Sequence, residues 1–220
     1  MISTTRANNP FGSAVSPGRC RELRTVLARF PDRLLIEDDH AGPIAGADLH
    51  TLTDGRERWV YVQSTAKWLG PDLRVALVAG DRSTIAYARG RQTLAPGWIS
   101  HILQQLVAHQ LSSHNAAAAV ARAEAAYTQR RELLIEALAK HDIRSHGRSG
   151  LNVWIPVPDE ARVVQAAAAS GWAIAAGQRF RIASPTAVRI TTALLDPTDL
   201  EAIAEDLTTW LRASFSSRRA

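Results

Sequence analysis

The chain has 220 residues, of which 46% are hydrophobic and 21% charged, and it carries a formal net charge of +5 with an isoelectric point near 10.1. This composition is typical of a globular protein and excludes a disordered chain, and no apolar stretch approaches the roughly 20 residues of a membrane span. The first residues lack the apolar core of a signal peptide, and the single Cys20 excludes an internal disulfide framework and fits a reducing cytoplasm.

The basic charge is spread along the chain. Its arginines are scattered, with adjacent pairs only at Arg130-Arg131 and Arg218-Arg219. A nucleic-acid surface gathers its basic residues and often interleaves them with aromatic ones, and a zinc site needs closely spaced Cys and His residues. The sequence shows neither pattern, so we expect neither direct DNA binding nor a metal site from these residues.

Short apolar runs that end in polar residues dominate residues 1–80. The spacing of Leu23, Val26 and Leu27 predicts a helix within residues 16–27. Three apolar runs predict strands at residues 34–36, 60–62 and 75–78, and they are followed by Glu37-Asp38, by Ser64 and by Gly80-Asp81. Runs of this kind with polar carboxyl ends are typical of a buried, mostly parallel sheet that has its chemistry at one edge.

The period of the apolar residues changes from about residue 97. Helices are predicted at residues 99–111, 116–140 and 159–170, and strands at 151–157, 173–174, 180–182 and 188–192. A capping box at residues 198–201 predicts a last helix that runs to about Trp210. The predicted fold class is therefore α/β, with residues 1–110 in part of a large domain and residues 111–220 in a smaller α+β domain.

Lys67 is one of only two lysines in a chain that otherwise uses arginine for its positive charge. It follows the apolar run at residues 59–62. Unlike a guanidinium group, an ammonium group can lose its proton and attack an aldehyde as a free amine. This makes Lys67 the first candidate for a Schiff-base residue, as in proteins that bind pyridoxal 5'-phosphate (PLP).

The neighbours of Lys67 include other groups that PLP needs. Asp38 follows a predicted strand, where its carboxylate could keep the pyridine nitrogen protonated, although a solvated carboxylate or a helix cap is the ordinary alternative. Ser64 and Lys67, three residues apart, are expected on one face at the start of a helix, whose dipole favours a phosphate group. Arg74 lies seven residues beyond Lys67 and could bind that phosphate, although such a residue is more often a surface arginine.

Two further polar residues lie far from this segment in the sequence. Asn9, within Asn8-Asn9-Pro10, would by itself be read as an Asx-Pro turn. Arg189 is a charge inside a predicted strand, so it needs a partner or a ligand. The order and spacing of all these residues together are more specific than any one of them.

As an ordered set, these residues resemble the aspartate aminotransferase superfamily of fold type I PLP proteins. A closer resemblance is to the MocR branch of the GntR transcriptional regulators, and within it to the PtsJ-type subgroup. The segments that carry it are residues 6–12 (Arg-Ala-Asn-Asn-Pro-Phe-Gly), 37–40 (Glu-Asp-Asp-His), 69–74 (Leu-Gly-Pro-Asp-Leu-Arg), 98–101 (Trp-Ile-Ser-His) and 150–154 (Gly-Leu-Asn-Val-Trp). The resemblance covers roughly residues 3–212.

The resemblance implies a role for each candidate. Lys67 matches the lysine that forms the Schiff base, and Asp38 matches the partner of the pyridine nitrogen. Asn9 and His40 match the residues near the 3'-oxygen, where most of the superfamily has tyrosine instead of His40. Ser64 and Arg74 match phosphate ligands, and Arg189 matches the arginine that binds a substrate carboxylate. One phosphate hydroxyl is lost, because Ala66 stands where serine is common.

The resemblance also implies that part of the family's architecture is absent from this sequence. In the family, a winged helix-turn-helix, a linker and the first part of the large domain precede the Asn-Pro-x-Gly segment. That part supplies a glycine-rich phosphate turn and the aromatic ring stacked on the cofactor. We therefore expect a fragment, a truncated gene product or a misannotated start, and a sheet with exposed edges.

Two functions remain open at this point. The first is a PLP-binding effector domain of a MocR-type regulator, which senses PLP or an amino compound without efficient turnover. Such a domain would be cytoplasmic and homodimeric, and it would reach DNA only through a helix-turn-helix outside this sequence. The second is an active aminotransferase, in which Lys67 would also move a proton as general acid and base. The sequence separates the two weakly, because both need nearly the same residues.

Overall fold

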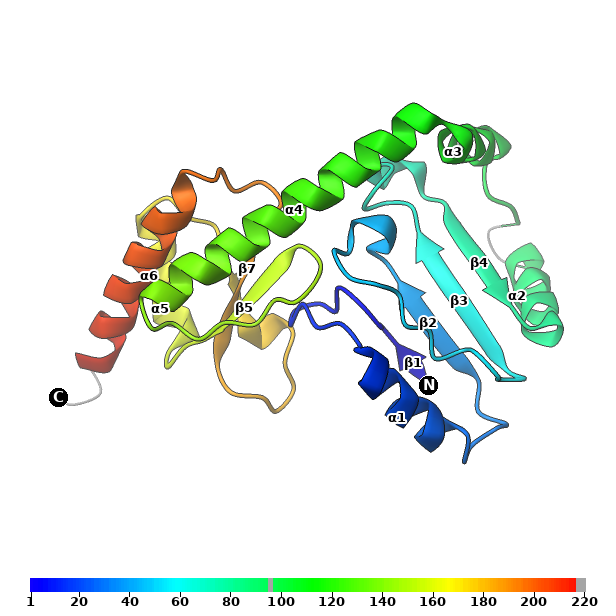
Figure 1. Ribbon diagram of the computed structural model, residues 1–220, viewed down its shortest axis with the longest axis horizontal. Coiled ribbons are helices and arrows are strands. Elements are labelled where there is room, and N and C mark those ends of the chain that lie inside the picture. Colours follow the sequence, from blue (N-terminus) through cyan, green and yellow to red (C-terminus); the bar gives the residue numbers. More distant parts are fainter. Residues whose placement is uncertain (95–96, 217–220) are drawn as a thin grey trace. The chain divides into compact units, whose positions relative to one another are not determined.

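The computed structural model describes residues 1–94 and 97–216 (Figure 1). The chain divides into two compact units, the first formed by residues 1–7 and 14–125 and the second by residues 8–13 and 126–220. The division falls within a long helix, whereas the sequence led us to expect a domain boundary between residues 110 and 111. Residues 8–13, which include Asn9, belong to the second unit.

A four-stranded sheet forms the centre of the first unit (Figure 1). Its strands are β1 (Ile2–Ser3), β2 (Leu35–Asp39), β3 (Trp59–Ser64) and β4 (Ala76–Gly80), in the spatial order β1-β2-β3-β4. The first three strands are parallel, and β4 pairs with β3 in the antiparallel direction. The predicted mostly parallel α/β sheet is confirmed, with β4 as the antiparallel member.

One face of the sheet is covered by α1 (Pro17–Leu27). The Ser16 hydroxyl accepts a hydrogen bond from the Arg19 amide at 3.2 Å, which caps the helix where Pro17 begins it. Cys20 and Leu27 of α1 pack against Leu35 and Leu52 to form a small apolar core. Burial of these side chains fixes α1 against β2, so the helix predicted within residues 16–27 is confirmed.

Two further helices of the first unit are α2 (Arg82–Leu94) and α3 (His101–Ser112). The long helix α4 (His114–Lys140) begins in the first unit and ends in the second. The sequence predicted α3 and α4 but not α2. Helix α2 has no buried residue, so it carries no apolar stripe that a periodicity argument could detect. Its one sequence signal is Asp81, whose carboxylate accepts a hydrogen bond from the Thr84 amide at 2.9 Å.

The second unit has an α+β fold with its own hydrophobic core. Strands β5 (Asn152–Pro156), β6 (Ala175–Ala176) and β7 (Ala187–Thr191) form a sheet in the order β5-β7-β6, packed with α5 (Glu160–Ala169) and α6 (Asp199–Ser216). Its core includes Leu134 and Leu138 of α4 and Ile203 and Leu207 of α6. In the part of the chain that the structure describes, no helix combines the length and apolar character that crossing a membrane requires.

Two predicted strands of this unit are wrong in detail. The strand expected at residues 173–174 lies at β6, two residues later. The strand expected at residues 180–182 is absent, because a short 3-10 helix (Gly177–Arg179) leads into a turn there. Two similar 3-10 helices lie in the first unit, at Gly42–Ile44 and Pro71–Leu73.

Gly12 holds a tight turn in the second unit. Its φ is +60°, and an added Cβ would lie 2.9 Å from the Asn152 carbonyl oxygen. The Gly12 carbonyl also accepts a hydrogen bond from the Ser149 amide at 2.9 Å. We expect Gly12→Ala to lower the free energy of unfolding by roughly 1–3 kcal/mol, through a left-handed backbone and a steric clash. Urea denaturation measures this change. Gly55→Ala is the control, because φ is also positive at Gly55 but an added Cβ would have no atom within 4 Å, so its loss of stability reports the backbone effect without the clash.

Candidate functional site

The carboxyl ends of β2 and β3 meet at one edge of the first sheet. The two strands are parallel, with Asp38 in register with Val62. Because side chains alternate between the faces of a strand, Asp38 and Ser64 lie on the same face of the sheet. The side chain of Asp38 is half-buried, and within the described part of the chain no group donates a hydrogen bond to its carboxylate. His40, directly after β2, is also half-buried.

Lys67 lies on a loop that begins and ends at this edge. Buried Thr65 closes the loop, because its hydroxyl donates to the Val75 carbonyl at 2.7 Å and its amide donates to the same oxygen. Ser64 precedes Thr65 and Arg74 precedes Val75, so the closure brings these two predicted phosphate ligands to the base of one loop. The side chains of Lys67 and Arg74 are exposed.

The helix expected after Ser64 is absent. The segment makes a single turn, in which the Leu69 amide donates to the Thr65 carbonyl at 2.9 Å, and it is followed only by the short 3-10 helix Pro71–Leu73. Gly70, with a φ of +144°, and Pro71 stop the helix from continuing. The predicted contribution of a helix dipole to phosphate binding is therefore wrong. Arg74 instead has a left-handed backbone, with a φ of +50°, which is uncommon outside glycine.

Asp39 lies on the opposite face of β2 from Asp38 and is the centre of a buried polar network. Only 1% of its side chain is exposed. It accepts two hydrogen bonds from the Arg6 guanidinium, at 2.7 and 3.1 Å, and one from the Tyr61 hydroxyl at 2.5 Å. The Gly42 amide and the Gln63 side chain also donate to it, at 3.2 and 3.4 Å. No pattern in the sequence indicated this network, apart from the second carboxylate next to Asp38.

The network holds Asp39 in its charged form. Burial alone would raise the pKa of Asp39, but the hydrogen bonds from Arg6 and Tyr61 and the charge of Arg6 outweigh it, and the pKa lies below its usual value. Burial would likewise lower the pKa of Arg6, and Asp39 reverses this, so that the pKa is raised. Burial and the neighbouring Asp39 raise the pKa of the Tyr61 hydroxyl.

The lowered pKa of Asp39 predicts loss of stability in acid. A carboxylate whose pKa is depressed by folding stabilises the fold above its unfolded pKa of about 3.9, and this contribution disappears as the pH falls through the folded pKa. We expect the free energy of unfolding to decrease below about pH 4, and Asp39→Asn to be less stable at pH 7 but to lose less on acidification. Urea denaturation at pH 7, 4 and 3 measures both slopes, and equal slopes in the two proteins would contradict the assignment.

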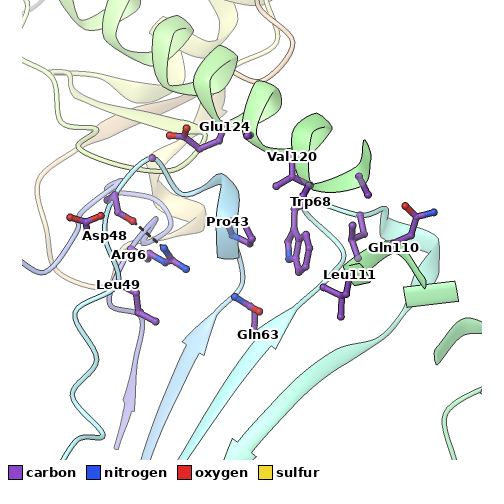
Figure 2. A pocket seen from close by; sticks show the side chains of 16 residues that line it. Arg6, Pro43, Asp48, Leu49, Gln63, Trp68, Gln110, Leu111, Val120 and Glu124 are labelled. Atoms are coloured by element: carbon purple, nitrogen blue, oxygen red, sulfur yellow. Dashed lines mark hydrogen bonds between the residues drawn. The ribbon is translucent and has the colours of Figure 1, made fainter. Parts of the chain in front are cut away.

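A cavity of about 880 Å³ in the first unit borders this network (Figure 2). Arg6 and Gln63 belong both to the network and to the cavity wall, and the Arg6 guanidinium donates to the Ala47 carbonyl at 3.1 Å, drawn as a dashed line in Figure 2. Trp68 forms part of the wall, and its indole nitrogen donates to the Ser64 carbonyl at 2.7 Å. Among the described lining residues there is no predicted cofactor residue, so the cavity is distinct from the face that carries Asp38.

The second unit brings together the other two predicted site residues. The Arg189 guanidinium donates a hydrogen bond to the side-chain oxygen of Asn9 at 2.8 Å. It also lies 4.5 Å above the ring of Phe180, and its Nε is buried without a hydrogen-bond partner. Burial and the nearby charge of Arg179 lower the pKa of Arg189. Only part of the donor capacity of this arginine is therefore used by hydrogen bonds within the second unit.

Comparisons with known proteins show the family to which this chain belongs. The family model "Aminotransferase class I and II" matches residues 1–207. The chain belongs to this family. The vitamin B6 salvage pathway transcriptional repressor PtsJ of Salmonella typhimurium is 31% identical over 94% of this chain and 49% of its own length. The HTH-type transcriptional regulator TauR of Rhodobacter capsulatus is 28% identical over 72% of this chain and 34% of its own length. The predicted resemblance to GntR/MocR-type regulators is confirmed.

The fold is also that of solved aminotransferases. The α-aminoadipate aminotransferase of Thermus thermophilus, complexed with N-(5'-phosphopyridoxyl)-L-leucine, matches with a TM-score of 0.83 and 19% identity, over 98% of this chain and 59% of that chain. At this level of identity the match establishes the fold alone. The chain spans about half the length of the curated regulator PtsJ.

The residues of this aminotransferase-family chain fit the chemistry of PLP. A half-buried carboxylate without a partner suits a protonated ring nitrogen, because burial of an uncompensated charge is unfavourable. The exposed Lys67 amine lies on a loop whose base carries a hydroxyl and a guanidinium group, the donors that a phosphate prefers. In the second unit, the guanidinium of Arg189 donates one hydrogen bond, to Asn9, and its buried Nε has no hydrogen-bond partner.

Proposed function

We propose that this chain is the PLP-binding, aminotransferase-like effector domain of a GntR/MocR-type transcriptional regulator, and that it senses PLP or an amino compound through Lys67. The observation that carries most weight is the half-buried, uncompensated carboxylate of Asp38, at the same sheet edge as the loop of Lys67. The similarity to two named transcriptional regulators favours sensing over turnover.

Each residue of the first unit has a role in this proposal. The amine of Lys67 would hold the cofactor covalently through its aldehyde carbon. Asp38 would keep the ring nitrogen protonated, and His40 would donate to the 3'-oxygen. Ser64 and Arg74 would bind the phosphate. When bound, PLP supplies an electron-accepting ring to an attached amine.

The second unit would recognise the amino compound. The side-chain oxygen of Asn9 accepts a hydrogen bond from Arg189, which leaves the NH₂ group of Asn9 as a donor for a ligand, the role that the resemblance implies for it at the 3'-oxygen. The guanidinium of Arg189 would bind a carboxylate of the ligand, since a planar fork of donors matches that group. Ligand binding at Arg189 would therefore be coupled to the position of Asn9, because the Asn9 oxygen accepts one of the hydrogen bonds that Arg189 can donate.

The regulatory output would lie outside residues 1–220. A helix-turn-helix module would bind DNA, and occupancy at Lys67 would alter that binding. The name of the relative PtsJ, a repressor of vitamin B6 salvage, makes PLP itself the first effector to test. Regulation of amino-acid metabolism would imply an amino acid as the effector instead.

A homodimer is part of the proposal. Ile102 and Leu106, four residues apart on one face of α3, are 78% and 42% exposed, and Trp98 just before the helix is 74% exposed. Large apolar side chains gathered in this way are typical of a protein interface. Light scattering of the purified chain tests the proposal, with a dimer for the native sequence and a monomer for Ile102→Asp as the expected result.

Sensing and turnover can be separated with one preparation. The chain is saturated with PLP, and amino compounds are added while the visible spectrum is recorded. A ligand-induced spectral shift without formation of a keto acid supports the sensor. Steady conversion of an amino acid and keto acid pair supports the aminotransferase, and absence of any PLP-dependent visible band would contradict both.

A further inference from the structure

Three consecutive acidic residues in β2 have three different environments. Glu37 is fully buried and accepts hydrogen bonds from the Thr51 hydroxyl and, at 2.7 Å, from the Leu52 amide. Asp39 lies on the same face and is saturated by the network around Arg6. Asp38 alone lies on the other face, half-buried and without a described donor. The alternation of the strand therefore separates two structural carboxylates from one that is available to a ligand.

The Asp39 carboxylate connects the segments that carry the proposed cofactor residues. Tyr61 and Gln63 donate to it from β3, and Gln63 directly precedes Ser64. The Gly42 amide donates to it from the segment after His40. Arg6 donates to it from the segment that leads to Asn9, with two bonds at 2.7 and 3.1 Å. A displacement of Asp39 would therefore shift the carboxyl ends of β2 and β3, where Asp38, His40 and Ser64 lie.

We infer that Arg6 and Asp39 are positioning residues for the cofactor, which fix the carboxyl end of β2 so that Asp38 and His40 face it. The inference rests on the proposed function, since it concerns the same PLP. Neither residue would touch the cofactor. Their effect would pass through the backbone of β2, where Asp38 and Asp39 are adjacent and point to opposite faces.

The test compares two Arg→Gln variants of the full chain in their affinity for PLP. Arg6→Gln is expected to weaken PLP binding about tenfold, the scale seen when outer partners of ligating groups are removed, and to change the pH dependence of the visible band. Arg56→Gln is the matched control, because Arg56 donates to three carbonyls of the first unit, those of Leu27, Phe30 and Arg33, which precede the amino-terminal end of β2. Urea denaturation of both variants gives their stabilities.

The outcomes are distinct. Weaker PLP binding in Arg6→Gln with near-native binding in Arg56→Gln, and partial rescue by Arg6→Lys, supports positioning. Native affinity and a native spectrum in Arg6→Gln overturn the inference and leave the proposed function intact. Equal losses of affinity in both Arg→Gln variants, in proportion to their loss of stability, also overturn it. A native chain that forms no visible band with PLP overturns the proposed function together with the inference.

Discussion

Lys67→Ala is expected to abolish the PLP-dependent visible absorbance of the purified chain. The substitution removes the only amine on the loop that begins at Ser64, and alanine cannot form a covalent bond with the aldehyde. Because Lys67 is exposed, the fold should be unaffected, with a free energy of unfolding within about 0.5 kcal/mol of the native value. Absorbance titration with PLP and urea denaturation measure the two quantities.

The chain provides its own control for this experiment. Lys140 is the second of its two lysines, and it forms an exposed ion pair with Glu201 at 3.1 Å. A pair of this kind contributes at most about 1 kcal/mol, so Lys140→Ala should fold and should keep the native spectrum. An unchanged visible band in Lys67→Ala, or loss of the band in Lys140→Ala, would contradict the assignment of Lys67.

Leu138→Ala is expected to give the largest loss of stability, about 3 kcal/mol. Leu138 is completely buried in the core of the second unit, where α4 meets α5, α6 and the sheet. Truncation removes buried apolar surface and leaves a cavity, and both effects lower the free energy of unfolding. The measurement is urea denaturation followed by circular dichroism.

Leu194→Ala is the matched substitution for Leu138→Ala. Leu194 belongs to the same unit and is 96% exposed, so its truncation should change the free energy of unfolding by less than about 0.5 kcal/mol. Equal effects of the two substitutions would mean that the second unit does not have the core described here.

The strand ends of the first unit were predictable because one local rule governs them. A buried parallel strand is an apolar run, and the run ends where the chain reaches the sheet edge. The positions of Asp38 and Ser64 after such runs therefore placed both residues at one edge, as β2 and β3 confirm. The same reasoning failed for α2, which buries no residue and has no apolar stripe.

Backbone details around Lys67 could not be derived in the same way. The spacing of Ser64 and Lys67 is equally compatible with a helix and with a single turn. Gly70 and Pro71 stop the helix locally, but the closure of the loop depends on Thr65, whose side chain bonds to Val75 ten residues later. Contacts over such distances in the sequence leave no local periodic signal.

The Arg6–Asp39 network could not be predicted from the sequence for the same reason. Its two charged members are 33 residues apart, and nothing in the spacing pairs one of many arginines with one of two adjacent aspartates. The alternation of β2 settles which carboxylate faces Arg6, but only after the buried face is known. The place of Asp38 at the sheet edge could thus be predicted, whereas the pairing of Asp39 with Arg6 required the structure.

Reductive trapping identifies the amine of this chain that binds PLP. The native chain is incubated with PLP, reduced with borohydride, digested and mapped by mass spectrometry. We expect one phosphopyridoxyl group on the peptide that contains Lys67, with none on Lys140 or on the amino terminus of Met1. A label on either of those amines instead, or no stable label after reduction, would contradict it.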